Sequence, residues 1–140
     1  CEGTSGNTAV SGTHGADYLK GGPGTGTLNG GDGNDTIYGN EGNATIRGGD
    51  GAGVDIINGG AGDDNITGSS QGGPDQIWGG DGNDTINMPG GAGGDVIHAH
   101  YGSGQIHCGS KTDLVYISHK SLPHYKLTGC KRISFKTVGY

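Results

Sequence analysis

An aliphatic residue recurs at short, regular intervals along most of the chain, and this period restricts the fold more than any other feature. Each one lies near the end of a glycine-rich unit of the form Gly-Gly-x-Gly-x-Asp-x-U-x, in which U is Val, Leu or Ile. Twelve successive units keep an aliphatic residue at U: Val10, Leu19, Leu28, Ile37, Ile46, Ile57, Ile66, Ile77, Ile86, Ile97, Ile106 and Val115. So short and regular a repeat predicts a solenoid, in which each unit packs against copies of itself.

The intervals between the U positions indicate how the units are arranged. From Val10 to Ile46 every interval is nine residues, and from Ile46 to Ile97 intervals of eleven and nine alternate. This alternation predicts two units per coil, with all the long units on one side. We call that side the long side and the opposite one the short side. The insertions would widen the long-side turns without moving the strands, and they are rich in glycine: Gly53-Val54, Gly72-Gly73 and Gly93-Gly94.

Each unit combines a turn with a short strand. The glycines permit the positive φ and the close backbone approach that tight turns need, and the U side chain of x-U-x points inward while its neighbours point outward. Parallel stacking of the coils then gives a narrow apolar ladder. Because 35 of the 140 residues are Gly and only 29% are hydrophobic, this ladder is too small to offset the entropy lost on ordering the backbone. A second stabilising interaction is required.

The Asp position of the unit predicts that this interaction is a metal ion. Side chains at equivalent positions lie about 4.8 Å apart in neighbouring coils, so a column of carboxylates is repulsive unless cations separate them. Ca²⁺ suits carboxylates and turn carbonyls, whereas Zn²⁺ would require His or Cys. The alternative, that Asp merely favours turns, does not explain why every long-side unit keeps one while the short side keeps two. The candidate ligands are Asp17, Asp35, Asp55, Asp75, Asp95 and Asp113 on the long side and Asp64 and Asp84 on the short side.

These units resemble the nonapeptide of the RTX (repeat-in-toxin) calcium-binding family, and the resemblance covers residues 6–116. It implies an all-β fold, a right-handed parallel β-roll with two repeats per coil and a C-terminal cap. It also implies that two successive turns on one side share each Ca²⁺. Family members with catalytic activity carry it in a separate domain, for which this chain has no room, so we expect no enzyme activity and no catalytic residues. The implied pairs are Asp17 with Asp35, Asp35 with Asp55, Asp55 with Asp75, Asp75 with Asp95, Asp95 with Asp113, and Asp64 with Asp84.

The two ends of the chain differ from the repeats. We divide the chain into a β-roll over residues 1–116 and a capping segment over residues 117–140, in which larger side chains replace the glycines. The sequence around Cys108 and Cys130 resembles the C-terminal end of small secreted bacterial RTX-like proteins, which implies a disulfide between these two residues and a secreted or extracellular protein. Cys1 is then left over, as a free thiol, an intermolecular bridge or a modified residue such as a lipid anchor.

The charge distribution limits the partners. The net charge is −6, which disfavours nucleic acid, and no stretch approaches the roughly 20 apolar residues that cross a bilayer. From residue 111 onward there are six bases and one acid, whereas the first 110 residues contain two bases and thirteen acids. An acidic body with a basic end favours head-to-tail contact between copies of the chain.

Three functions are compatible with these features. The leading hypothesis is a secreted calcium-stabilised structural protein that joins end to end into an extracellular fibre. The second is a module that binds an extracellular polysaccharide or a cell surface through outward side chains in one row, including Tyr38, Trp78, His98 and Tyr116. The third is ice binding by a Thr/Asn array on the other sheet, an array that Arg47 interrupts. The six histidines recur with no carboxylate or serine at a catalytic spacing, and we interpret them as surface residues.

Overall fold

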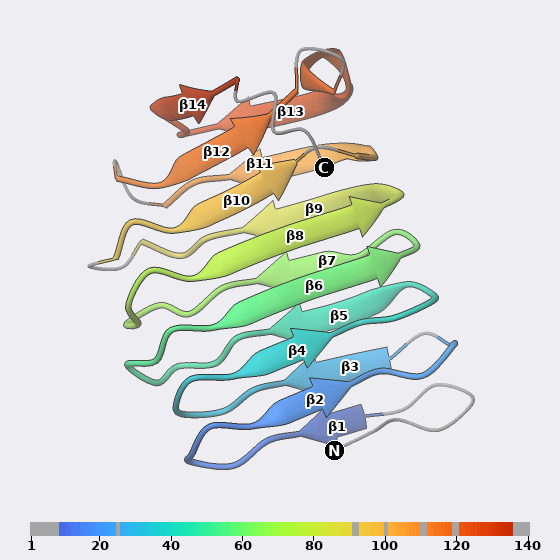
Figure 1. The fold of residues 1–140 in the computed structure, drawn as a ribbon, viewed down its shortest axis with the longest axis vertical. Coiled ribbons are helices and arrows are strands. Elements are labelled where there is room, and N and C mark those ends of the chain that lie inside the picture. The colour runs from blue at the N-terminus through green and yellow to red at the C-terminus, as the bar shows by residue number, and fades with distance from the viewer. Residues whose placement is uncertain are drawn as a thin grey trace.

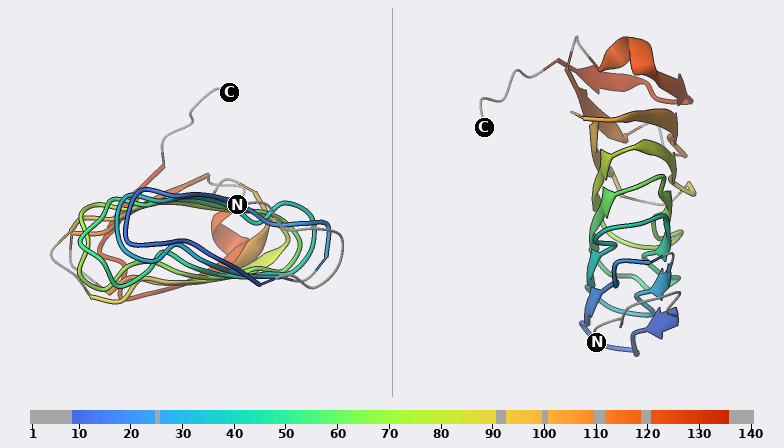
Figure 2. Two further views of the ribbon diagram at one scale, coloured as in Figure 1. Left: turned by 90° about the horizontal axis from the view of Figure 1, so that it is seen from below. Right: turned by 90° about the vertical axis from the view of Figure 1, so that its right-hand side faces the viewer.

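The chain alternates between two parallel sheets as it advances coil by coil along one axis (Figure 1). The computed structural model describes residues 9–24, 26–90, 93–99, 101–109, 112–118 and 121–135. Strands of the front sheet in Figure 1 run to the right and those of the back sheet run to the left while the chain rises, so the coil is right-handed. Seen along its axis the coil is a flattened oval, and seen from the side the coils form a column (Figure 2). The predicted right-handed parallel β-roll is confirmed.

Each sheet has seven strands among the described residues, and successive strands of the chain belong to different sheets. The long-side turns lead into sheet A, which contains β2 (Tyr18–Lys20), β4 (Thr36–Tyr38), β6 (Ile56–Ala61), β8 (Gln76–Asp81), β10 (Val96–Ala99), β12 (Leu114–Ile117) and β14 (Arg132–Ser134). The short-side turns lead into sheet B, which contains β1 (Ala9–Ser11), β3 (Gly26–Asn29), β5 (Ala44–Arg47), β7 (Asn65–Thr67), β9 (Asn83–Asn87), β11 (Ser103–His107) and β13 (Tyr125–Thr128).

The U side chains form the apolar core between the sheets. All twelve are buried, and even Val10, at the N-terminal end of the described solenoid, is only 8% exposed. The strand register places each U residue opposite the U residue of the next coil, as for Ile57 with Ile77 in sheet A and Ile46 with Ile66 in sheet B. The nine- and eleven-residue units thus keep the same inward positions, because the insertions lie in the turns.

The second glycine of the unit takes a backbone conformation that most other residues avoid. Its φ is +104° at Gly31, +102° at Gly60 and +106° at Gly80, and a Cβ at Gly60 would lie 2.1 Å from the carbonyl oxygen of Asn40 in the preceding coil. Glycine is therefore needed at these turns both for the positive φ and for the close stacking of coils.

The sheets continue beyond the last glycine-rich unit. A short 3₁₀ helix (Leu122–His124) precedes β13, whose Leu127 pairs with Ile106, and Ile133 of β14 pairs with Val115. The segment expected as a cap over residues 117–140 therefore contributes one strand to each sheet. Tyr125 is buried at this end, and its hydroxyl donates to the carbonyl oxygen of Tyr101 at 2.5 Å.

A disulfide between Cys108 and Cys130 holds this last coil to the body. Cys108 follows β11 and Cys130 follows β13, and their Cα atoms are 4.9 Å apart. The predicted pairing is confirmed, whereas Cys1 lies outside the described residues. No helix among the described residues is long and apolar enough to cross a membrane.

Candidate metal centre

The eight predicted aspartates gather at the two sides of the solenoid, seven of them directly before a strand and Asp84 as the second residue of β9. The long-side column contains Asp17, Asp35, Asp55, Asp75, Asp95 and Asp113, and the short-side pair contains Asp64 and Asp84. Seven of the eight are at most 5% exposed, and Asp17 at the N-terminal end is half-buried. The fold thus places carboxylates in register inside the turns, where their charge loses contact with water.

One oxygen of these carboxylates serves the backbone of the neighbouring coil. The N–H of Asp35 donates to Oδ1 of Asp55 at 2.9 Å, and the N–H of Asp64 donates to Oδ1 of Asp84 at 3.0 Å. The same bond joins every successive pair of the long-side column, at 2.9 to 3.3 Å. Between neighbouring acids there is therefore an amide donor, which the sequence argument for a cation did not foresee.

The other carboxylate oxygen divides five of the aspartates into two kinds. Oδ2 of Asp35, Asp64 and Asp84 is buried and has no hydrogen-bond partner in the described part of the chain. In contrast, Oδ2 of Asp17 accepts from both the N–H and the hydroxyl of Thr13, and Oδ2 of Asp75 accepts likewise from Ser69. A buried polar atom without a partner is costly, so the first kind favours binding of a ligand that the described residues do not supply.

Burial makes these carboxylates hard to ionise. It raises the pKa of Asp64 to about 7 and that of Asp55, Asp84 and Asp95 to about 6, because the charged form loses its hydration. Burial also raises the pKa of Asp35. At Asp17 the backbone N–H of Thr13, followed by its hydroxyl, lowers the pKa instead. A cation beside the buried carboxylates would stabilise their ionised form.

The surroundings of the unpartnered oxygens fit a hard cation. A Cβ on Gly30 would lie 2.3 Å from both Oδ2 of Asp35 and the carbonyl oxygen of Gly48, and a Cβ on Gly59 would lie 2.4 Å from both Oδ2 of Asp64 and the carbonyl oxygen of Gly79. Glycine thus keeps open a space bordered by a carboxylate and a carbonyl of the next coil. Within the described ranges no three acidic, His or Cys side chains converge, so backbone carbonyls must supply most of the ligands. Ca²⁺ accepts such oxygen-only sets.

Comparison with known families agrees with this chemistry. A model of the RTX calcium-binding nonapeptide repeat matches the chain four times, over residues 2–37, 21–54, 38–72 and 69–87. The chain belongs to that family. No curated protein and no solved structure matches it. RTX nonapeptide repeats bind Ca²⁺ and are calcium-binding rather than catalytic units. In this RTX protein, Asp35, Asp64 and Asp84, together with turn carbonyls, have the oxygens to hold the ion, and the ion would supply the positive charge that the buried carboxylates need.

The repeat continues beyond the matched residues. Asp95 and Asp113 follow residue 87 and extend the long-side column through the same Oδ1 hydrogen bonds. The assignment of all eight aspartates as ligands in six pairs remains a prediction. The hydroxyls of Thr13 and Ser69 were not predicted as partners of the carboxylates. Their residue type is the signal in the sequence, since both stand where the unit normally has its second glycine.

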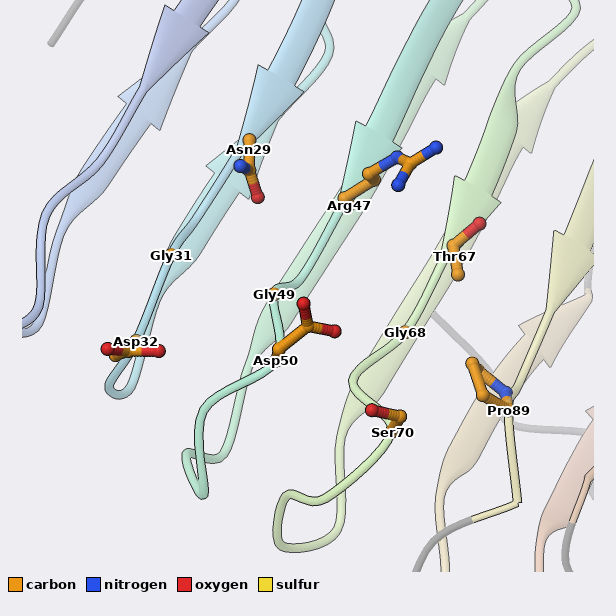
Figure 3. Close-up of a pocket in the computed structure, with 10 residues that line it drawn as sticks. All are labelled: Asn29, Gly31, Asp32, Arg47, Gly49, Asp50, Thr67, Gly68, Ser70 and Pro89. Carbon is orange, nitrogen blue, oxygen red and sulfur yellow. The ribbon is translucent and has the colours of Figure 1, made fainter.

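A groove lies beside the long-side turns rather than over the carboxylates. It holds about 200 Å³ and runs past the C-terminal ends of β3, β5 and β7. Figure 3 shows Arg47 at the end of β5 and, at successive turns, Asp32, Asp50 and Ser70. Asp32 also contacts His14, with 2.6 Å between Oδ2 and Nδ1. The lining of the groove combines charged, hydroxyl and amide side chains with glycines and Pro89, and the buried aspartates are not among these residues.

The row of outward side chains on sheet A forms as the register predicted. Tyr38, Trp78, His98 and Tyr116 occupy equivalent positions on β4, β8, β10 and β12. The Trp78 and His98 rings are stacked at 4.4 Å between centroids, and those of His98 and Tyr116 at 5.4 Å. The Thr/Asn array of sheet B is in register too, but Arg47 stands within it and Gln105 and Lys126 continue one of its rows.

Proposed function

We propose that this RTX protein is an extracellular structural protein whose β-roll forms a rigid rod when it binds Ca²⁺ and then joins end to end with other copies. The observation that carries the calcium dependence is the set of unpartnered, buried Oδ2 atoms of Asp35, Asp64 and Asp84. Without a cation these atoms oppose folding, and the single ladder of U side chains is too thin to compensate. Ca²⁺ binding therefore becomes folding free energy.

End-to-end joining is supported by the strand edges and by the charge. Within the described residues β1 and β2 are the first strands of the sheets and β13 and β14 are the last, so each end of the column offers strand edges. Unpaired edges bind further strands unless they are protected. The C-terminal end carries the exposed Lys126, Lys131 and Arg132, and all acids but one precede residue 111. Opposite charges meet only when the copies join head to tail, a contact that grows into filaments.

Light scattering of the native protein tests this assembly. In millimolar Ca²⁺ we expect the mean mass to rise with protein concentration, and high salt should reduce the rise because it screens the attraction between opposite ends. Reversing the charge of the last coil with Lys126→Glu and Lys131→Glu should abolish it, whereas Arg47→Glu, on the exposed end of β5 away from both ends of the column, serves as a matched control. A constant monomer mass in Ca²⁺ at all concentrations would contradict end-to-end joining but not calcium binding.

Surface binding by the aromatic row is the second candidate. The stacked rings of Trp78, His98 and Tyr116 present their faces to one another, so a polysaccharide would meet mainly their edges. Such cross-strand stacking also stabilises a sheet without any ligand. Trp78 is the only Trp in the chain, so a change in Trp fluorescence on adding an acidic or a neutral polysaccharide would favour this role, and an unchanged spectrum with both would oppose it.

A further inference from the structure

In five of the turns, the residue at the second position of the unit correlates with how the carboxylate of the same turn is satisfied. We call this residue position two. It is a glycine in the turns of Asp35, Asp64 and Asp84 and a hydroxyl residue in those of Asp17 and Asp75. Among the described residues the first group contains the three unpartnered Oδ2 atoms and the second contains both hydroxyl-bonded ones, while Asp55, whose turn has Gly49 at position two, is in neither group. The position-two residues are Gly31, Gly60 and Gly80 in the first group and Thr13 and Ser69 in the second.

A hydroxyl residue at position two gives the carboxylate two donors. Ser69 donates to Oδ2 of Asp75 through its N–H at 3.1 Å and through its hydroxyl at 2.8 Å, and both residues are buried. Thr13 makes the same two bonds to Oδ2 of Asp17, at 2.5 and 2.9 Å. Two hydrogens thus face this oxygen. Their partial positive charges would repel a cation that approached the same lone pairs.

A glycine at position two leaves the oxygen without these donors. Gly31, Gly60 and Gly80 have φ between +102° and +106°, and neither an N–H nor a side chain of the described residues reaches Oδ2 in those turns. Among the described non-glycine residues only Asn40 has a positive φ, so Thr13 and Ser69 hold the turn in a different backbone conformation. The choice of residue therefore changes both the backbone and the donors.

We propose that the hydroxyl residue at position two replaces Ca²⁺ in its turn. This inference rests on the proposed calcium-dependent folding and specifies where the ions bind. The Oδ2 atoms of Asp35, Asp64 and Asp84 bind Ca²⁺, whereas those of Asp17 and Asp75 are satisfied by Thr13 and Ser69 and bind none. Two of the eight predicted ligands are thereby removed from the set, and part of the long side is stabilised by hydrogen bonds independently of the metal.

The test is a gain of binding measured by isothermal titration calorimetry of the full chain with Ca²⁺. Ser69→Gly removes the hydroxyl and permits a positive φ, so we expect the stoichiometry to rise by about one ion per chain. Ser69→Ala lacks the hydroxyl but retains the negative φ and the N–H donor, and it should gain no ion. Ser70→Gly is the matched control for an added glycine in the same turn. Circular dichroism in Ca²⁺ establishes that each variant folds.

A second pair of variants keeps the test decisive. Adding Asp75→Asn to Ser69→Gly should return the stoichiometry to the wild-type value, because the gained ion would depend on that carboxylate. Thr13→Gly should show the same gain at the Asp17 turn, the first described turn of the long side. If the wild type binds Ca²⁺ but Ser69→Gly and Thr13→Gly, both folded, bind no more, the inference is overturned while the proposed function stands. If the wild type binds no Ca²⁺, the proposed function fails and the inference fails with it.

Discussion

The short-side pair and the long-side column contain the same residue in the same position of the repeat, yet they differ in what their carboxylates contact. Asp64 and Asp84 both lie in turns with two glycines, and Oδ2 of each is unpartnered. In the long-side column, Oδ2 is unpartnered at Asp35 and bonded to a hydroxyl at Asp17 and Asp75. The number of aspartates on a side therefore does not measure how much that side depends on metal.

This difference arises from the turns and not from the strands. On both sides the backbone N–H of one aspartate donates to Oδ1 of the aspartate in the next coil, with nearly the same geometry. The long side differs in its two-residue insertions and in the residue types at position two. Substitutions that separate the two carboxylate environments should therefore have different effects at Asp84 and at Asp75, although both residues are fully buried.

The largest effect is expected from Asp84→Asn compared with Asp75→Asn. Asparagine keeps an Oδ1 acceptor for the neighbouring amide, so each substitution mainly alters the Oδ2 side. With Ca²⁺ at about 100 times Kd, Asp84→Asn should lose about 3 kcal/mol of metal-linked unfolding free energy. Asp75→Asn should lose about 1 kcal/mol from weakened hydrogen bonds. Denaturant unfolding at two Ca²⁺ concentrations measures both losses of unfolding free energy, and equal losses of calcium stoichiometry in the two variants would contradict the distinction.

The second prediction is that the stability of the fold changes with pH in opposite directions in the presence and absence of Ca²⁺. The folded-state pKa values of Asp55, Asp64, Asp84 and Asp95 lie at about 6 to 7, above the ordinary value of 3.8. In chelator, stability is therefore fully present below about pH 4 and is lost as the pH rises through 6 to 7. In Ca²⁺ the stability should instead rise over the same pH range, because fewer protons then compete with the ion for the carboxylates.

The same titration distinguishes the carboxylates that burial affects from Asp17, which accepts hydrogen bonds from Thr13. Asp64 has the highest pKa of these four carboxylates, so Asp64→Asn should flatten the upper part of the pH profile in chelator. Asp17→Asn is the control, because Thr13 lowers the pKa of Asp17 and that residue is already ionised in this window. An unchanged profile in Asp64→Asn, with stability still falling between about pH 6 and 8, would show that other groups cause the dependence.

The smallest effect is expected at Asn40, which occupies position two in a short-side turn that has Ala44 in place of an aspartate. Its φ is +83°, so Asn40→Ala should cost about 1 kcal/mol of backbone strain and Asn40→Gly should relieve strain. Neither should change the calcium stoichiometry. Thermal unfolding of the two variants in Ca²⁺ measures the difference, and a lost ion in either would mean that position two acts on the metal without a carboxylate.

Much of the fold follows from the sequence because the repeat determines it directly. The aliphatic U residues predict the core, their intervals predict two units per coil, and parallel stacking fixes which residues pair, from Val10 with Leu28 to Ile97 with Val115. Strands β13 and β14 could not be predicted in this way, since Leu127 and Ile133 follow no glycine-rich turn. Their pairing depends on tertiary contacts, including the disulfide and the burial of Tyr125.

The candidate site could be predicted only in part. The period identifies the aspartates and their two sides, but it does not reveal which atom of each carboxylate meets a donor. The amides that approach Oδ1 become visible only once neighbouring coils are stacked. The donors from Thr13 and Ser69 depend on a change of φ at position two. The repeat pattern records these two residues only as departures from glycine and does not predict that change.

The central claim is that Ca²⁺ supplies the free energy that the thin core lacks, and a calcium titration followed by far-ultraviolet circular dichroism tests it most directly. The full chain is first placed in excess chelator and then titrated with Ca²⁺ into the millimolar range, with Mg²⁺ as a parallel control. At a pH above the raised carboxylate pKa values of about 6 to 7, we expect a disordered spectrum in chelator, a cooperative change to a β-sheet spectrum as Ca²⁺ is added, and little change with Mg²⁺. The same β-sheet spectrum in excess chelator as in Ca²⁺ would contradict the claim.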